Sequence, residues 1–369
     1  MAYFENVIIG SGPAGAACGI TLQSSKSENC VIDRAVFPRN KTCAGLVTTK
    51  TYNLIQTLMG EDCRDGLFCA EAKAVRLFDK TEMLVSAPIT NAVRLVNRRE
   101  FDNALVDRYK ALGGTLFDGE QILRIDYKSN KIRLKSGKII QYKNLVFADG
   151  ALSLAHKQIN FKKENLGFGI EAYIPSDKFN TDSVDLFFDY VADGYFWAFP
   201  HGETVCVGFG NRYSKSTDYR GILTDFLRER GIDCKGQKYV GAFLPYGNAV
   251  PQNKLPKNVM LTGDAAGFTD PVSGEGLYMS MKSGILAANA LKTSSPKKNY
   301  LESVKPLIRI VNDGRKAQKL FYTPVIHKKI IDKIRNSSGG FVGFYFDNMV
   351  DEYRYDYRSL PTLYKKSRR

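Results

Sequence analysis

A glycine-rich turn near the N-terminus constrains the fold of this chain more than any other feature. The segment Gly10–Gly15 reads Gly-Ser-Gly-Pro-Ala-Gly, follows an apolar strand and opens a helix. Gly10 permits the tight turn, Gly12 lets a pyrophosphate approach the backbone, and Gly15 lets helix and strand pack closely. The free N–H groups and the positive dipole end of that helix attract phosphate groups. The pattern predicts a Rossmann-like unit that binds a dinucleotide.

An acidic residue stands where such a unit binds ribose. Asp33 ends the next apolar strand, which begins at Cys30, and lies 18 residues after Gly15. Its carboxylate can accept hydrogen bonds from both ribose hydroxyls. An acid rather than an arginine disfavours a 2′-phosphate, so the site is expected to hold FAD or NAD rather than NADP. No second strand, glycine turn and acid follow, which disfavours an architecture with two dinucleotides.

Two later strand ends narrow the choice of cofactor. The strand over residues 145–148 ends in Asp149, and the strand over residues 259–262 is followed by Gly263-Asp264 and by Gly274-Glu275-Gly276. In this order after the first turn, the motifs resemble flavoproteins of the hydroxybenzoate hydroxylase type. The resemblance implies that Asp264 binds the ribityl chain of FAD. It also implies that the following helix points its N-terminal N–H groups at the N1/C2=O edge of the flavin.

Two segments resemble the geranylgeranyl reductase family within that superfamily. Residues 38–46 (PRNKTCAGL) are similar to the family's basic-x-Cys-Gly-Gly loop beside the flavin ring, with Ala44 in place of a glycine. Residues 195–200 (YFWAFP) fit its Tyr-x-Trp-x-Phe-Pro motif. The resemblance covers residues 3–290. It implies an enzyme that saturates C=C bonds of an isoprenoid or prenyl lipid by hydride transfer from N5 of reduced FAD.

The aromatic segment and the cysteine loop supply the candidate substrate and catalytic residues. Tyr195, Trp197 and Phe199 share one face of a strand, which either forms ordinary sheet core or walls a cavity for a long apolar substrate. The neighbouring motifs favour the cavity. Cys43 and Tyr195 are the candidates for protonating the second alkene carbon, and Cys43 can also be read as a small buried apolar residue.

The expected contacts to FAD combine the motifs with positions that the resemblance supplies. Arg98 matches the superfamily arginine that meets the pyrophosphate, and Ile122 falls where the backbone lies against adenine. The electron donor stays open between NAD(P)H and a carrier such as ferredoxin. The expected cofactor-binding residues are Gly10, Gly12, Ala14, Gly15, Asp33, Arg34, Ala44, Arg98, Ile122, Asp149, Asp264, Gly274, Gly276 and Leu277.

The order of these motifs predicts an α/β fold in which one domain is inserted into another. A Rossmann-like FAD-binding domain is interrupted by a mainly antiparallel β-sheet substrate domain, and a basic helical C-terminal region follows. The FAD-binding domain is expected to comprise residues 1–78, 93–155 and 255–298, the substrate domain residues 79–92 and 156–254, and the C-terminal region residues 299–369.

Positive charge is concentrated at the C-terminal end of the chain. Residues 292–369 carry 18 Lys and Arg against 7 Asp and Glu, which is +11 of the formal net charge of +15, together with eleven aromatic residues. Such a region suits an anionic membrane surface or an acidic electron carrier, and equally a solvated basic face over an aromatic core. No nucleic-acid-binding motif accompanies the charge, which disfavours nucleic acid as a partner.

Other chemistries receive less support from the sequence. The three histidines are far apart and no metal-ligand spacing occurs, so no metal site is expected. Seven cysteines without CxxC spacing, and no long apolar run, predict a cytoplasmic protein with reduced thiols that is at most peripheral to a membrane. A flavin-dependent monooxygenase and a non-catalytic electron-relay protein remain as alternative functions.

Overall fold

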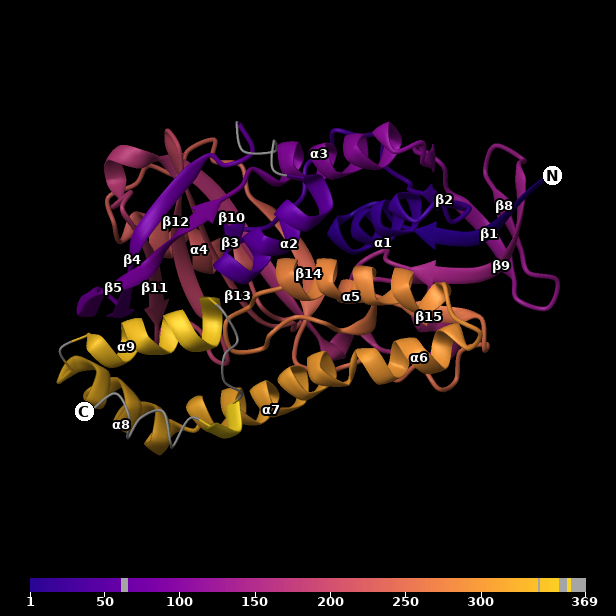
Figure 1. Cartoon of the computed structure of the whole chain (residues 1–369). Helices are drawn as coiled ribbons and strands as arrows, with labels where there is room; N and C mark the ends of the chain where they lie inside the picture. The colour runs from indigo at the N-terminus through magenta and orange to yellow at the C-terminus, as the bar shows by residue number, and fades with distance from the viewer. Residues whose placement is uncertain (61–65, 338, 352–356, 360–369) are drawn as a thin grey trace.

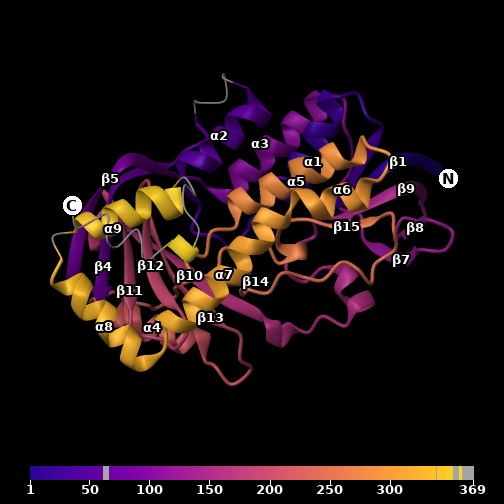
Figure 2. The same ribbon diagram turned by 60° about the horizontal axis from the view of Figure 1, so that its bottom comes forward.

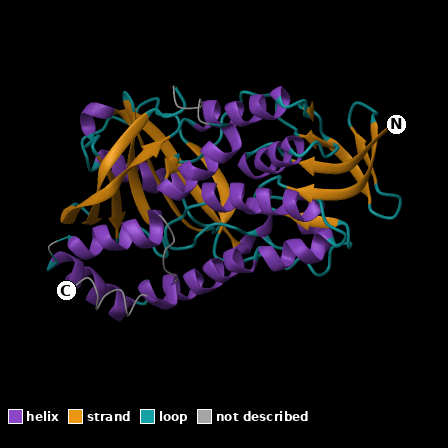
Figure 3. Ribbon diagram, in the orientation of Figure 1, coloured by secondary structure: helices purple, strands orange, loops and turns teal. Residues whose placement is uncertain are grey.

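The fold consists of two sheets that meet along a layer of helices (Figures 1 and 3). The computed structural model describes residues 1–60, 66–337, 339–351 and 357–359. The first sheet lies at the N-terminal end of the molecule, and the second lies beside the C-terminal helices (Figure 1). This is the α/β architecture, with its helical C-terminal region, that the sequence predicts.

The first sheet is the dinucleotide-binding unit. Its parallel strands run in the order β6-β2-β1-β9-β15, and β8 and β7 continue it from β9 as antiparallel strands. Val7 of β1 lies opposite Cys30 of β2 and Leu145 of β9. Both faces of β1 are buried, which explains its continuous apolar run at Val7–Ile9. The strands are β1 (Ala2–Ile9), β2 (Asn29–Ile32), β6 (Thr115–Phe117), β7 (Ile122–Asp126), β8 (Lys131–Leu134), β9 (Ile139–Phe147) and β15 (Val259–Leu261).

Helices pack closely on this sheet because glycines remove side chains at the contacts. A Cβ on Gly284 of α5 would lie 2.1 Å from the carbonyl oxygen of Ala14 in α1, so the two helices touch backbone to backbone. Tyr109 of α3 packs over Gly19 in the same way, with its ring 2.8 Å from the position of an added Cβ. The helices are α1 (Pro13–Ser24), α2 (Thr49–Met59), α3 (Arg98–Ala111), α5 (Leu277–Leu291) and α6 (Pro296–Ser303).

The second sheet has the order β14-β10-β13-β12-β11-β4-β5-β3. Its neighbours are antiparallel except for β11 and β4, which run parallel. It is therefore mainly antiparallel, as predicted. The strands are β3 (Leu46–Val47), β4 (Ala70–Asp79), β5 (Glu82–Leu95), β10 (Leu166–Pro175), β11 (Ser183–Phe188), β12 (Tyr195–His201), β13 (Thr204–Arg212) and β14 (Val240–Pro245).

The expected boundary between the domains differs from the observed sheet. The sequence places residues 70–78 in the FAD-binding domain by their position in the chain, but they lie in β4 of the second sheet. They belong there because β4 and β5 form a long hairpin, and β4 also pairs with β11. Pairing with a strand more than 100 residues later is a long-range contact, which no local pattern in residues 70–78 reveals.

The two faces of the second sheet are covered differently. On one face, α4 (Tyr219–Arg228) inserts Phe226 against Phe196 and Phe209. On the other face, the C-terminal helices pack Val342 and Phe346 against β4 and β5 (Figures 1 and 2). These helices are α7 (Lys305–Phe321), α8 (Pro324–Arg335) and α9 (Gly340–Tyr345), followed by a π-helical turn at Phe346–Asp351. None of the helices in the described ranges is long and apolar enough to cross a membrane.

Candidate functional site

A cavity of about 1910 Å³ runs from the glycine turn to the C-terminal helices. Pockets for one small molecule or cofactor measure about 300–1,000 Å³, so this cavity has room for a dinucleotide and a second molecule. Thirteen of the fourteen expected cofactor-binding residues line it, as do Cys43, Tyr195, Trp197 and Phe199. Gly15 does not, because a Cβ there would lie 1.8 Å from the carbonyl oxygen of Gly10, so its role is packing.

Within the glycine turn, there is open space around Gly12, whereas Gly10 and Gly15 lie in close contact with neighbouring backbone atoms. Gly10 has φ +96°, and a Cβ on it would lie 2.5 Å from the carbonyl oxygen of Ala148. A Cβ on Gly12 would lie 3.5 Å from the Arg39 guanidinium and no closer to any other atom of the described residues. Gly12 thus leaves backbone exposed beside a cation, which fits a pyrophosphate at the N-terminus of α1.

Asp33 lies at the wall of the cavity and is already partly engaged. Its Oδ2 accepts hydrogen bonds from Ser11 N–H at 2.7 Å and Ser11 Oγ at 2.8 Å, and its Oδ1 accepts one from Ala35 N–H at 2.8 Å. A carboxylate has about four acceptor positions, so one remains for a ribose hydroxyl. These bonds also fix the carboxylate against the glycine turn.

Two arginines face the cavity beside the glycine turn and share one buried carboxylate. Arg98 donates to Asp102 at 2.8 and 3.0 Å, and Arg39 lies 3.2 Å from the same carboxylate. The two guanidinium groups line the cavity with one compensating charge between them, which favours an anion there. Arg39 was not among the expected cofactor residues. In the basic-x-Cys spacing of the cysteine loop the basic residue is Lys41, so the motif itself gave no signal for Arg39.

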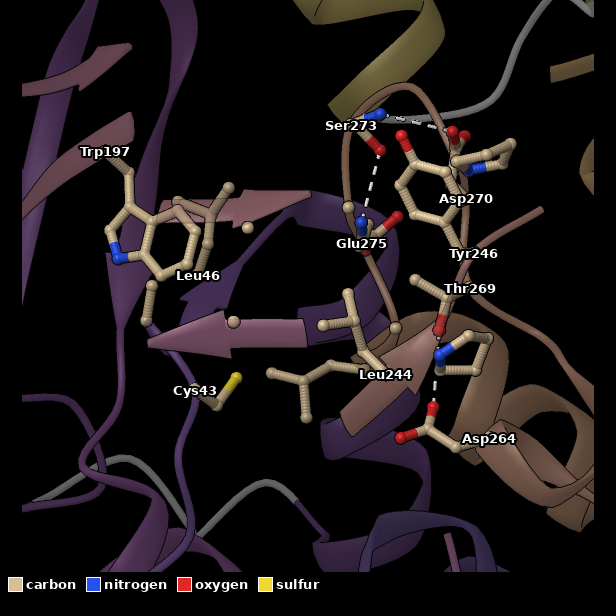
Figure 4. A pocket seen from close by; sticks show the side chains of 18 of the residues that line it. Cys43, Leu46, Trp197, Leu244, Tyr246, Asp264, Thr269, Asp270, Ser273 and Glu275 are labelled. Carbon is tan, nitrogen blue, oxygen red and sulfur yellow. Dashed lines mark hydrogen bonds between the residues drawn. The ribbon is translucent and has the colours of Figure 1, made fainter. Parts of the chain in front are cut away.

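The loop that precedes α5 has the features of a flavin site. Asp264 lies at the cavity, where burial raises the pKa of its carboxyl, and accepts a hydrogen bond from Thr269 Oγ1 at 3.3 Å (Figure 4). Gly276 caps α5, and a Cβ on Gly274 would lie 2.9 Å from the Tyr195 hydroxyl. The N–H groups at the start of α5 therefore border the cavity, as expected for a helix that stabilises an anionic reduced flavin.

Glu275 of this loop forms a buried ion pair with Lys50 of α2, with Nζ and Oε2 2.8 Å apart. Hydroxyl groups of Thr48 and Thr51 donate to its other oxygen at 3.1 and 2.9 Å. Lys50 Nζ also donates to the carbonyl oxygen of Val350. The flavin loop, α2 and the C-terminal segment are thus held together by one charged cluster.

Cys43 presents its thiol to the cavity from the loop before β3 (Figure 4). The Cys43 N–H donates to Oε1 of Glu171 at 3.0 Å, and the Gly45 N–H donates to the thiol at 3.4 Å. Ala44, which replaces the family glycine, also lines the cavity, and its carbonyl oxygen accepts a hydrogen bond from His201 Nε2 at 2.8 Å. The loop therefore lies against the cavity despite the extra methyl group.

Glu171 is a functional candidate that the sequence analysis missed. It lies on β10 with 1% of its surface exposed, and its Oε2 has no hydrogen-bond partner within the described residues. Burial raises the pKa of its carboxyl to about 7, although the hydrogen bond from Cys43 N–H opposes this shift. A buried acid with a pKa near neutrality, at the wall of a cavity, is a candidate proton donor.

A glycine on the central strand makes room for Glu171 and Trp197 together. Gly208 of β13 lies opposite Glu171 on one side and Trp197 on the other. A Cβ on Gly208 would lie 2.6 Å from the Trp197 ring and 2.9 Å from Glu171 Cβ. The glycine that trails the aromatic motif could have pointed to Glu171, because a bare position in a sheet often marks crowded neighbours.

Tyr195 lines the cavity, and its hydroxyl is bonded to the flavin loop. Its hydroxyl donates to the carbonyl oxygen of Ser273 at 2.7 Å, and burial raises its pKa. A hydroxyl with a raised pKa is a weak acid, so this geometry favours a positioning role over proton donation.

Comparisons with known proteins identify relatives of most of the chain. The chain matches the pyridine nucleotide-disulphide oxidoreductase family over residues 4–186. It is 30% identical over 299 residues to an uncharacterized protein of Methanosarcina barkeri, covering 80% of this chain and 76% of that protein. It is 28% identical over 322 residues to the geranylgeranyl diphosphate reductase of Rhodobacter capsulatus, covering 82% and 77%.

Solved structures share the fold at low sequence identity. A geranylgeranyl bacteriochlorophyll reductase-like protein from Thermoplasma acidophilum superposes with a TM-score of 0.80 at 17% identity, covering 98% of this chain and 100% of that one. The probable FAD-dependent monooxygenase pqsL from Pseudomonas aeruginosa has a TM-score of 0.69 at 13% identity, covering 91% and 100%.

Fold, motifs and relatives together define an FAD-dependent oxidoreductase. The chain belongs to a family of FAD-dependent oxidoreductases, and its relatives include proteins named geranylgeranyl reductases. The residues present fit FAD, because Gly12 leaves space beside Arg39, Arg98 shares Asp102 with Arg39, and the N-terminus of α5 borders the cavity.

Proposed function

We propose that this protein saturates C=C bonds in the apolar chain of an isoprenoid or prenyl lipid. The observation that carries the proposal is the apolar half of the cavity, which lies beyond Trp197 and between the second sheet and the C-terminal helices. We call it the apolar chamber. It is lined by Val75, Leu77, Val184, Leu186, Phe188, Phe321, Ile330, Ile334, Phe341, Val342, Tyr345 and Phe346.

A long apolar chain fits this chamber better than a small polar substrate does. Side chains from β4, β11 and α7–α9 cover it with aliphatic and aromatic groups, and such a lining gains free energy by removing hydrocarbon from water. The same lining excludes water from the reacting double bond. Similarity to a geranylgeranyl diphosphate reductase of Rhodobacter capsulatus and to a digeranylgeranylglycerophospholipid reductase of Methanococcus aeolicus supports this substrate class.

Reduced FAD, when bound, supplies the hydride that one alkene carbon accepts. The protein would hold the cofactor and the alkene in positions that allow this transfer. Arg98 and Arg39 would hold the pyrophosphate, Asp264 would hold the ribityl chain, and the start of α5 would stabilise negative charge. Trp197, which lies across the cavity from Asp264 in Figure 4, and Phe199 would hold the alkene.

Glu171 supplies the proton to the other alkene carbon. Oε1 is held by the Cys43 N–H, which leaves Oε2 as the oxygen that carries the proton. The raised pKa, about 7, keeps that proton in place near neutral pH. Cys43 is a positioning residue in this step, and solvent reprotonates Glu171 after the product leaves. The electron donor is NAD(P)H or a reduced carrier such as ferredoxin.

The test uses dithionite-reduced holoenzyme and a defined prenyl lipid without oxygen. Mass spectrometry of the extracted lipid is expected to show a gain of two hydrogens for each saturated bond. A second candidate, a monooxygenase, is favoured by the fold shared with pqsL. A product that gains one oxygen atom, and only when air is admitted, would select it. Reoxidation by electron acceptors without any lipid product would instead indicate an electron-relay protein.

A further inference from the structure

The turn between α7 and α8 carries exposed cations beside exposed apolar side chains. Leu320 is 56% exposed and Val325 is 67% exposed, although both are large and apolar. Lys319, Lys328 and Lys329 are exposed around them. We call this area the corner surface, and it comprises Lys316, Lys319, Leu320, Val325, Lys328 and Lys329.

Helical spacing places these residues on continuous faces. In α7, Lys316 precedes Lys319 and Leu320 by three and four residues, and in α8, Val325 precedes Lys328 and Lys329 by the same intervals. Residues at these spacings are neighbours on a helix. Residues 314–331 contain five Lys and Arg and no Asp or Glu. The corner surface is therefore cationic with an apolar centre.

The corner surface adjoins the apolar chamber. Leu320 is exposed and also lines the cavity, together with Phe321 and Tyr322 at the turn and Ile330 of α8. In Figures 1 and 2 the turn between α7 and α8 lies at the outer edge of the molecule, away from the first sheet. Apolar side chains thus connect the interior chamber to this part of the surface.

We propose that the corner surface docks the protein on an anionic lipid bilayer, so that a lipid chain enters the chamber through the α7–α8 turn. This inference deepens the proposed function, because it rests on a lipid substrate. Lysines near an anionic membrane attract it electrostatically, and exposed apolar side chains enter the boundary between headgroups and acyl chains. An acidic protein partner would account for the lysines but not for exposed Leu320 and Val325.

The opposite end of the molecule provides a matched control. The hairpin of β7 and β8 is also basic, with exposed Lys128 and Lys135 and with Leu123 61% exposed. It forms the antiparallel edge of the first sheet and lies far from α8 in Figure 1. If net charge alone drove binding, the two ends would contribute equally.

The experiment measures cosedimentation of the full-length holoprotein with vesicles of phosphatidylcholine and phosphatidylserine. The double substitution Lys328→Glu and Lys329→Glu is expected to weaken binding at least tenfold. Leu320→Ser with Val325→Ser is expected to weaken it severalfold, and Lys128→Glu with Lys135→Glu much less. Equal losses at both ends, or no loss at the corner surface, would overturn the proposal. So would binding of an acidic ferredoxin that depends on the two lysines while vesicle binding does not.

Vesicle binding is read without turnover, so its outcome is separate from that of the proposed reaction. If turnover is also observed, the corner variants are expected to retain activity on detergent-dispersed lipid and to lose it on lipid embedded in vesicles. Equal activity of wild type and variants on embedded lipid would contradict entry through this turn. Absence of any reduced lipid in both formats would refute the proposed function instead.

Discussion

The two ends of the cavity are built on different principles. At the dinucleotide end, Gly10, Gly12 and Asp33 act through backbone geometry and a few polar contacts within one strand–turn–helix unit. At the other end, the apolar chamber is assembled from β4, β11 and the C-terminal helices, which are far apart in the sequence. The first end is specified locally and the second by long-range packing, so substitutions should affect them differently.

The largest difference is expected within the glycine turn itself. Gly15→Ala places a Cβ 1.8 Å from a backbone oxygen, so it should disrupt the turn and abolish accumulation of folded holoprotein. Gly12→Ala meets no such contact, so it should leave the fold intact and weaken FAD binding at least tenfold. Flavin-to-protein ratios and circular dichroism separate the two results. Equal flavin content in Gly12→Ala and wild type would show that no phosphate lies there.

The second largest effect is expected for Glu171, which lines the cavity. Glu171→Gln is expected to slow lipid reduction about 10²-fold or more, because general acids contribute about 10²–10⁴-fold. In the wild type the rate should be constant below pH 7 and fall about tenfold per pH unit above it, since the pKa of Glu171 is raised to about 7. The variant should lose this break, which single-turnover flavin reoxidation across pH measures.

Stability gives a second readout of Glu171. A carboxyl whose folded-state pKa is raised from 4.5 to about 7 favours folding when protonated, and this advantage is lost as pH rises through that interval. The free energy of unfolding should therefore fall more steeply between these pH values in wild type than in Glu171→Gln. Parallel curves would show that Glu171 is not protonated in the folded protein.

The buried ion pair of Lys50 and Glu275 lies between the two ends of the cavity, and loss of its positive charge should lower the free energy of unfolding strongly. Lys50→Met leaves Glu275 buried without its cation, which typically costs about 3–5 kcal/mol of unfolding free energy. Arg99→Met removes an exposed pair with Glu100 and should cost at most about 1 kcal/mol. Urea denaturation of the two variants compares them. Similar midpoints would mean that the Lys50 cluster does not hold the flavin loop.

The smallest effect is expected where the C-terminal segment touches the flavin loop. The Tyr357 hydroxyl donates to both oxygens of buried Asp270 at 2.6 and 2.7 Å. Tyr357→Phe should therefore cost about 1.5–3 kcal/mol, the range for hydrogen bonds to charged groups. Tyr190→Phe, at an exposed contact with Glu229, is the control. Thermal unfolding that ranks Tyr190→Phe as the more damaging change would contradict this assignment.

The difference between the locally specified dinucleotide end and the apolar chamber also explains which features could be predicted from the sequence. The glycine turn, Asp33 and the Gly263-Asp264 pair are recognisable because each needs a particular residue type at a fixed spacing. Glu171 and the apolar chamber are not, because an acid in a strand has no special pattern until Gly208 and Cys43 are brought beside it. The same applies to β4, whose sheet is decided by its pairing with β11.

In the basic C-terminal region, one feature is recognisable in the sequence and another is visible only in the structure. Its charge is evident from the sequence, but the corner surface requires knowing that Leu320 and Val325 are exposed. The basic charge of the C-terminal region also predicts that truncation after residue 350 weakens binding to anionic vesicles. Most of that segment, residues 352–356 and 360–369, lies outside the described residues. The corner substitutions therefore offer a more specific experiment than truncation.

The proposed reaction requires that electrons pass from reduced FAD directly to a prenyl double bond. To test this, the holoenzyme is reduced fully without oxygen, a stoichiometric prenyl lipid is added and the yellow absorbance of oxidised flavin is followed. The colour is expected to return in proportion to the lipid added, and a saturated analogue is expected to have no effect. Flavin that stays bleached with both lipids until oxygen is admitted would contradict it.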